Sequence, residues 1–173
     1  KPDIHKALEK LECKVGVEIG VRIGGHFREL IKNKKFKEGL LYGVDCWTED
    51  PSKPETNDIG LSQQELDQQY FNVVLEYSQN PHAKIIRNYS YEASLSFPND
   101  FFDFIYIDAS HRADDTFMDA YFPDNRIWRG KACGVYQAVN EFVIEKNTDV
   151  HHVTDTNKEG GPGVSCNSFF IIK

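Results

Sequence analysis

The chain lacks the features that define several large classes of protein. No apolar run reaches the length of a membrane span and no signal peptide is visible, so we expect a soluble, cytoplasmic protein that binds no membrane. Beyond residues 32–37 there is no stripe of Lys and Arg, and the formal net charge is −7, which argues against a nucleic-acid partner because phosphate binding needs a basic surface. The cysteines include no C-x-x-C pair, which favours reduced thiols over a zinc site or a disulfide framework. They are Cys13, Cys46, Cys133 and Cys166.

The composition is that of one globular domain. The 173 residues are 40% hydrophobic, which suits a single domain over 1–173 with one core. Short apolar runs alternate with segments of helical spacing, and this alternation predicts an α/β fold with a Rossmann-like, doubly wound, mostly parallel sheet. We expect strands at 40–45, 83–87 and 101–108, and a helix over 63–79.

The most informative stretch is 16–25, Gly-Val-Glu-Ile-Gly-Val-Arg-Ile-Gly-Gly, where an apolar strand is expected to turn into a helix. Glycines at such a turn let the backbone approach a ligand and adopt positive φ angles, and the following helix begins with unpaired N–H groups. These properties suit a nucleoside cofactor. A dinucleotide site would have the pattern G-x-G-x-x-G, whereas Glu18, Gly20 and Gly24 form E-x-G-x-x-x-G. An ordinary strand-to-helix turn is the alternative interpretation.

An acid stands at the end of the next predicted strand. A carboxylate at this place, Asp45, can accept hydrogen bonds from both ribose hydroxyls of a nucleoside. The alternative is an Asp that caps a helix or stabilises a turn. Trp47 either forms a wall of the adenine pocket or packs in the core. His26 comes directly after the glycines, and we expect its side chain to be exposed to solvent, with a contact to cofactor or acceptor as the alternative.

The pattern E-x-G-x-x-x-G resembles motif I of the class I S-adenosylmethionine-dependent methyltransferases. Residues 85–90 and 97–98, together with the run Asp-Phe-Ile-Tyr-Ile-Asp-Ala-Ser-His at 103–111, resemble the branch of that family that includes the macrocin-type sugar O-methyltransferases. The resemblance extends over nearly the whole chain and implies S-adenosylmethionine as the cofactor. In the family, the acid of motif I lies near the amino end of the cofactor, and the residues after the third strand flank the adenine. The implied cofactor-binding residues are Glu18, Gly20, Gly24, Asp45, Trp47, Tyr89 and Ser90.

The same resemblance implies a reaction centre at the end of the fourth strand. In macrocin-type relatives a divalent cation, expected to be Mg²⁺, is held there by acids, and a histidine acts as the base. This makes Asp108 a catalytic residue and metal ligand, and His111 the general base. An exposed loop histidine is the alternative for His111. We expect Asp114 and Asp115 to cap the next helix instead of binding metal.

One element of the family pattern is not readable. A fifth strand should follow the helix that begins near Asp114, but 128–131 runs directly into 132–139, which resembles the start of the next helix. Either the protein has lost this strand, or residues that lie between Lys131 and Ala132 are missing from this sequence. We expect the second, because loss of a central strand would leave the edges of its two neighbours without hydrogen-bond partners. Near the C-terminus, 150–154 and 166–172 resemble the antiparallel hairpin that closes the edge of the sheet in class I methyltransferases.

These patterns predict a methyltransferase that acts on a hydroxyl of a small molecule or sugar. Methyl transfer from a sulfonium is an in-line displacement that depends on alignment, and the acceptor hydroxyl must lose its proton to a base or to a metal. The alternatives are an NAD(P)-dependent oxidoreductase of the same fold, a cofactor-binding module without catalysis, and N-methylation, which needs no strong base. The oligomeric state is left open.

Overall fold

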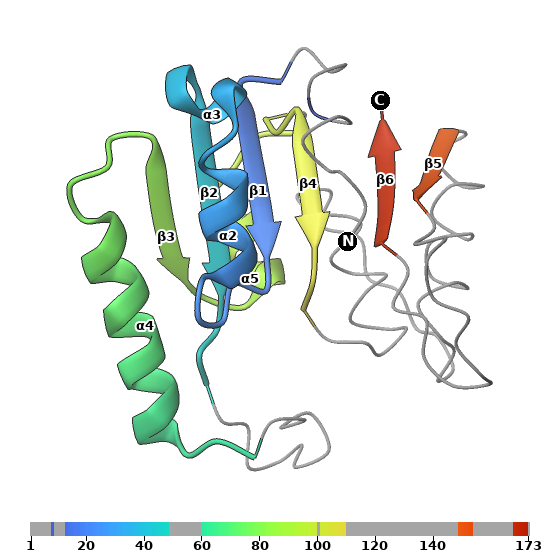
Figure 1. Cartoon of the computed structure of the whole chain (residues 1–173). Helices are drawn as coiled ribbons and strands as arrows, with labels where there is room; N and C mark the ends of the chain where they lie inside the picture. Colours follow the sequence, from blue (N-terminus) through green and yellow to red (C-terminus); the bar gives the residue numbers. More distant parts are fainter. Residues whose placement is uncertain are drawn as a thin grey trace, which may run out of the picture.

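The computed structural model contains a four-stranded parallel sheet in the order β3-β2-β1-β4 (Figure 1). Its strands are β1 Val15–Ile19, β2 Leu40–Asp45, β3 Ala83–Arg87 and β4 Phe104–Ile107. The structure describes Leu8, residues 13–48, 60–99 and 101–109, and the backbone of 149–153 and 168–172. The α/β, Rossmann-like prediction is confirmed, and the strands expected at 40–45 and 83–87 have the observed bounds.

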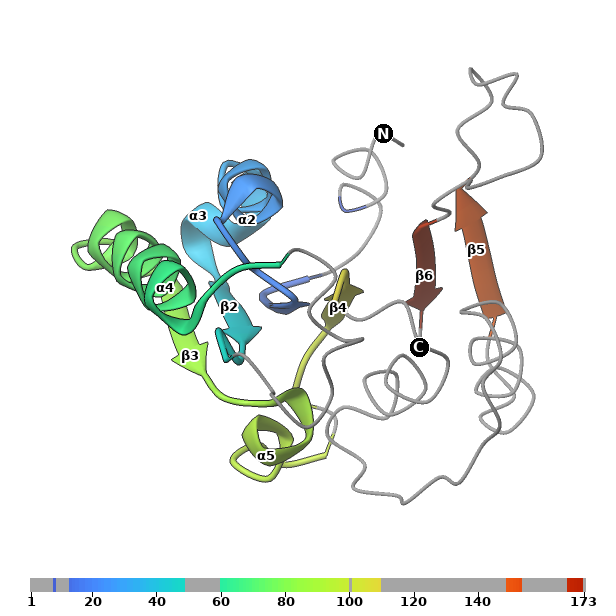
Figure 2. The same cartoon turned by 90° about the horizontal axis from the view of Figure 1, so that it is seen from below.

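The connecting helices lie on both faces of this sheet. Helices α2 Gly25–Leu30, α3 Lys34–Glu38 and α4 Gln63–Tyr77 cover one face, and α5 Ser90–Ser94 covers the other (Figure 2). The expected helix over 63–79 is therefore present as α4. It begins with a capping box, in which the Ser62 hydroxyl accepts from the Glu65 N–H and the Glu65 carboxylate accepts from the Ser62 N–H.

Side chains alternate between two cores, as the period of a strand requires. On β1, Val17 and Ile19 belong to the core under α5, whereas Glu18 lies on the face covered by α2. On β4, Phe104 and Tyr106 point to the α2 face, whereas Ile105 and Ile107 point to the other face. Glu18 is thus a carboxylate inside a largely apolar layer.

The C-terminal hairpin is also present. Strands β5 Asp149–Val153 and β6 Ser168–Ile172 pair antiparallel, and β6 lies beside β4 (Figure 1). The expected fifth strand, the gap between Lys131 and Ala132, and His111 fall outside the described residues. Among the helices that are described, none combines the length and the apolar character needed to cross a membrane.

Gly43 allows α2 to pack directly on the sheet. A Cβ at this central position of β2 would lie 2.9 Å from Val21 Cγ2, 3.0 Å from Phe27 Cε2 and 3.1 Å from Ile85 Cδ1. No room is left for a methyl group, because protein interiors are close-packed. The distance between α2 and β2, and with it the shape of the loop before α2, depends on this glycine.

We predict that Gly43→Ala lowers the free energy of unfolding by about 1–3 kcal/mol, because the added methyl overpacks the core. The matched control is Gly25→Ala, where a Cβ meets nothing within 4 Å at the start of α2. That variant should be as stable as the wild type or slightly more stable, since alanine favours a helix. Urea unfolding followed by circular dichroism measures both, and equal stability of the two variants would contradict the packing argument.

Candidate functional site

Strands β1 to β4 all end at the same edge of the sheet (Figure 1), and several of the residues singled out from the sequence follow these ends. The glycine turn follows β1, Asp45 ends β2, Tyr89 comes shortly after β3, and Asp108 follows β4. The strand order reverses between β1 and β4. In open α/β sheets, ligands bind outside the carboxyl ends of the strands at such a switch point. The topology therefore selects this edge as the candidate site.

The glycine turn is held between the ends of β2 and β4. Gly20 has φ +94° and Gly24 has φ +74°, conformations that favour glycine. The Gly20 N–H donates to the Val44 carbonyl at 2.8 Å. A Cβ on Gly20 would lie 2.2 Å from the Asp108 carbonyl oxygen, so the turn passes against the backbone of the β4 end. Only glycine fits at position 20.

The Asp45 carboxylate links the loops that follow β1 and β2. Its Oδ2 accepts from the Arg22 N–H at 2.8 Å and its Oδ1 accepts from the Trp47 N–H at 3.0 Å. Asp45 therefore stabilises turns, as the second interpretation of the sequence proposed. A carboxylate offers about four lone-pair sites, so two accepted bonds leave capacity for further donors such as ribose hydroxyls.

Both N–H donors belong to residues with a strained backbone. Arg22 has φ +53° and Trp47 has φ +43°, the only positive φ values of non-glycine residues in the part of the chain that is described. Such conformations cost about 1–3 kcal/mol each and persist where the surroundings determine them, most often at ligand-binding sites. Here the Asp45 carboxylate holds both residues. The strain makes this pair of loops a candidate ligand-binding site.

The buried side chain of Trp47 packs beneath the two loops and joins them. Its side chain is 1% exposed and its ring packs against Tyr70, with the ring centroids 5.0 Å apart. The indole Nε1–H donates to the Arg22 carbonyl at 2.8 Å, which is a second bond between the two loops. The structure places Trp47 in the core, as the packed interpretation proposed, and its role as an adenine wall stays a prediction.

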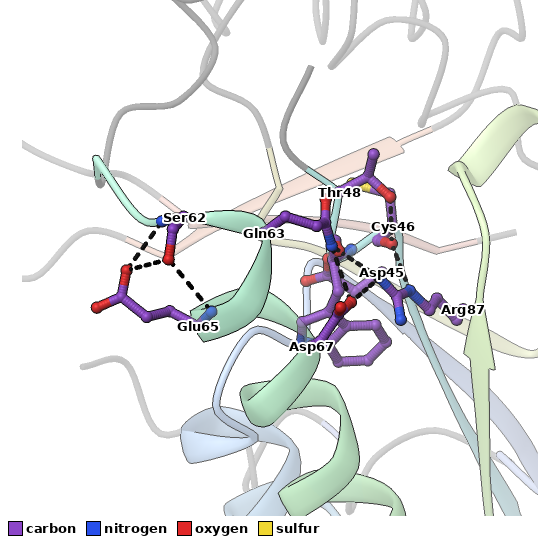
Figure 3. Close-up of polar contacts among 9 residues, drawn as sticks. Asp45, Cys46, Thr48, Ser62, Gln63, Glu65, Asp67 and Arg87 are labelled. Atoms are coloured by element: carbon purple, nitrogen blue, oxygen red, sulfur yellow. Dashed lines mark hydrogen bonds and ion pairs between the residues drawn. The ribbon is translucent and has the colours of Figure 1, made fainter. Parts of the chain in front are cut away.

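A polar cluster fastens the β2 loop to β3 and α4 (Figure 3). Arg87, at the end of β3, donates to the Trp47 carbonyl at 2.8 Å and to the Asp67 carboxylate on α4. Gln63 donates to the same carbonyl at 3.0 Å and to Asp67 at 2.8 Å. The bond from Arg87 lowers the pKa of Asp67, and burial raises the pKa of the Cys46 thiol, so Cys46 stays protonated at neutral pH. The sequence reasoning missed this cluster, because its members are distant in sequence.

His26 is not exposed, so that expectation is wrong. Its Nδ1 lies 3.0 Å from Glu18 Oε1, and the side chains of His26 and Glu18 are 10% and 1% exposed. The His26 ring stacks on Tyr106, with the ring centroids 4.0 Å apart. A buried carboxylate needs a hydrogen-bonding or charged partner, and Glu18 finds this one on the helix above it. The partner could have been inferred from an acid in the middle of a buried strand.

The loop after β3 joins the same edge. The Asn88 N–H donates to the Asp45 carbonyl at 3.0 Å, which holds the following residues beside the β2 end. Tyr89 precedes α5 and is 47% exposed, and Ser90 is the first residue of that helix. The exposed ring of Tyr89 offers a face on which a base can stack.

Asp108 lies exposed at the end of β4, next to Gly20. Within the described ranges, no three or more His, Cys, Asp or Glu side chains are grouped so that they could hold a metal. The structure thus brings together Gly20, Asp45, Asp108 and the loop with Tyr89, while Glu18 lies beneath the glycine turn.

Comparison with known proteins supports the fold. No protein-family model and no curated protein sequence matches the chain. Among solved structures it is similar to an S-adenosylmethionine-dependent methyltransferase from Aquifex aeolicus, with a TM-score of 0.54, 13% identity, and coverage of 99% of this chain and 90% of that one. It is also similar to a candidate caffeoyl-CoA O-methyltransferase from Staphylococcus aureus, with a TM-score of 0.54, 9% identity, and coverage of 98% and 80%. The chain therefore has the fold of the class I S-adenosylmethionine-dependent methyltransferases.

We predict that Trp47→Phe lowers the free energy of unfolding by about 1–2 kcal/mol, because phenylalanine keeps a buried ring but cannot donate to the Arg22 carbonyl. Thr48→Val is the control in the same loop. It removes an exposed hydroxyl bond to the Cys46 carbonyl and should cost about 0.5 kcal/mol or less. Chemical denaturation measures both, and an unchanged stability of Trp47→Phe would show that the indole bond does not hold the two loops together.

Proposed function

We propose that the chain is an S-adenosylmethionine-dependent methyltransferase that methylates a hydroxyl group of a small molecule. The observation that carries the proposal is the hydrogen bond from the Arg22 N–H to the Asp45 carboxylate, which joins the glycine turn to the acid after β2. These are the two halves of the nucleoside site inferred from the sequence. The likeness of the fold to methyltransferases supports the same conclusion. We treat 1–173 as one methyltransferase domain.

The residues at the carboxyl edge fit this cofactor. Gly20 and Gly24 give the turn its positive φ angles, and Asp45 keeps acceptor capacity for the two ribose hydroxyls. Tyr89 and Ser90 are proposed to flank the adenine, and they lie on a loop that the Asn88 N–H joins to the Asp45 carbonyl. When bound, S-adenosylmethionine supplies an electrophilic methyl group on a sulfonium. The protein's part is to align the acceptor oxygen with that methyl group and to exclude water.

The acceptor side of the reaction is assigned from the resemblance to macrocin-type enzymes, which favours a sugar hydroxyl as acceptor. His111 is proposed to remove the proton of the acceptor, and Asp108 is proposed as a ligand of Mg²⁺. Of the two, Asp108 is described, at the exposed end of β4. Since the described residues contain no group of metal ligands around Asp108, we derive no step through the metal.

The proposal is first tested by binding. Isothermal titration calorimetry with S-adenosylhomocysteine, the demethylated product, should show binding to the wild type. Asp45→Ala should weaken that binding by about 1.5–3 kcal/mol, because it removes hydrogen bonds to a charged acceptor. Binding of a nicotinamide dinucleotide in place of S-adenosylhomocysteine would favour the oxidoreductase alternative.

A matched control separates binding from stability. Asp103 lies at the opposite edge of the sheet, where its Oδ2 accepts from the Lys14 and Val15 N–H groups at 2.9 Å each. Asp103→Ala therefore removes a pair of hydrogen bonds from backbone N–H groups, as Asp45→Ala does. It should lower stability and leave the affinity for S-adenosylhomocysteine unchanged. If both variants weaken binding equally, the effect of Asp45 is on the fold and not on the ligand.

The second test concerns turnover on an accepted hydroxyl substrate. We predict that a chelator abolishes the rate of the wild type, and that Asp108→Ala loses the response to Mg²⁺, because a hard cation relies on carboxylate oxygens. His111→Ala should lower kcat by roughly a hundredfold with little change in cofactor affinity, as expected of a general base. A wild-type rate that survives the chelator would exclude the metal role, and an unaffected His111→Ala would exclude the base.

A further inference from the structure

The buried hydrogen bond between Glu18 and His26, beneath the glycine turn, has no role in the proposed function so far. Glu18 is on β1, and its neighbours across the sheet are Gly43 on β2 and Tyr106 on β4. His26, in the first turn of α2, contacts two of these three strands. Its Nδ1 is 3.0 Å from Glu18 Oε1, and its ring lies nearly parallel to that of Tyr106, at 25°. His26 Nδ1 and Glu18 Oε1 are thus hydrogen-bonded partners inside the protein.

The pair is a poor source of stability. Burying two polar side chains costs about as much as the hydrogen bond between them returns, so apolar residues of similar size often serve a core equally well. What the pair supplies is direction, because a hydrogen bond between a ring nitrogen and one carboxylate oxygen tolerates little rotation. Direction matters here because Arg22 and Ile23 are exposed and Gly24 and Gly25 have no side chains. His26 is the first side chain after them that is held inside the protein.

We propose that His26 is a positioning residue for the cofactor: bound to Glu18 and stacked on Tyr106, it sets the path of the glycine turn so that the Arg22 N–H meets Asp45. The inference rests on the proposed function for its binding readout. Glu18 then acts on the cofactor through His26, and not by direct contact with the cofactor's amino end. The Arg22 N–H is the reporter of this arrangement, because it donates to Asp45 only when the turn has its observed shape.

The test compares two replacements of His26. His26→Asn places an amide nitrogen where Nδ1 lies and can still donate to Glu18, whereas His26→Phe keeps a ring on Tyr106 and cannot donate. Two quantities are measured, namely the Kd for S-adenosylhomocysteine by calorimetry and the hydrogen exchange of the Arg22 amide without ligand. The control is His82→Phe. His82 is a half-buried histidine whose Nδ1 bonds to the Gly39 carbonyl at 2.8 Å, near the amino ends of the strands.

We expect His26→Phe to raise the Kd by about tenfold or more and to speed exchange of the Arg22 amide. His26→Asn should stay within about threefold of the wild type in both quantities, and His82→Phe should match the wild type. Two outcomes would overturn the proposal. One is a His26→Phe variant with the Kd and exchange of the wild type, and the other is a His26→Asn variant as impaired as His26→Phe.

A second variant is needed in case His26→Phe does not fold. It also tests whether Glu18 acts on the cofactor through His26. Glu18→Leu removes the acceptor with an apolar side chain of similar size. It should impair binding and protection as His26→Phe does, and combining the two should add little, because both break the hydrogen bond between Glu18 and His26. Additive losses would mean that Glu18 meets the ligand directly. If the wild type binds no S-adenosylhomocysteine, the proposed function fails, and the exchange of the Arg22 amide still decides the role of His26.

Discussion

The carboxyl edge of the sheet depends on one side chain, the carboxylate of Asp45. Arg22 and Trp47 each hold a left-handed backbone conformation that costs about 1–3 kcal/mol. Their N–H groups donate to the two oxygens of Asp45, and hydrogen bonds to a charged group contribute about 1.5–3 kcal/mol each. The cost and the gain have the same size. The hydrogen bonds to this carboxylate therefore offset the strain of both loops. The Trp47 indole adds a bond between the loops, and the cluster around Arg87 holds the second loop against the sheet.

At each end of the sheet, an Asp carboxylate accepts hydrogen bonds from two backbone N–H groups. Asp103 joins the N–H groups of Lys14 and Val15 where the strands begin, and Asp45 joins those of Arg22 and Trp47 where they end. Of these two carboxylates, only Asp45 binds residues with a strained backbone, since Lys14 and Val15 have no positive φ. Asp103 thus resembles a structural fastening, whereas Asp45 stabilises a conformation that the chain would not otherwise adopt.

Sequence periodicity predicted the elements whose signals are local. Strands β2 and β3 are short segments rich in apolar residues, and α4 follows from its apolar spacing. Helix α3 was missed, because its basic residues conceal a single buried side chain, Phe36. The burial of His26 was also missed, since it depends on a carboxylate eight positions earlier that only the sheet places beneath it. The role of Asp45 in binding a cofactor stays a prediction, and its bond to Arg22 could not be predicted, because that bond depends on the shape of both loops.

The glycines alone would not distinguish a ligand site from a tight turn. Gly20 is required by the backbone of Asp108, against which any side chain would collide, and Gly24 by its positive φ. Both reasons are internal to the fold, so the motif is explained without a ligand. Neither the fold nor these glycines therefore identifies the chemistry, because one fold carries many functions. The evidence for a ligand is different. Asp45 can accept further hydrogen bonds after accepting those from the Arg22 and Trp47 N–H groups, and the exposed Tyr89 is on the neighbouring loop. A ligand with vicinal hydroxyls and a flat base matches those two features, and this is the chemistry of a nucleoside.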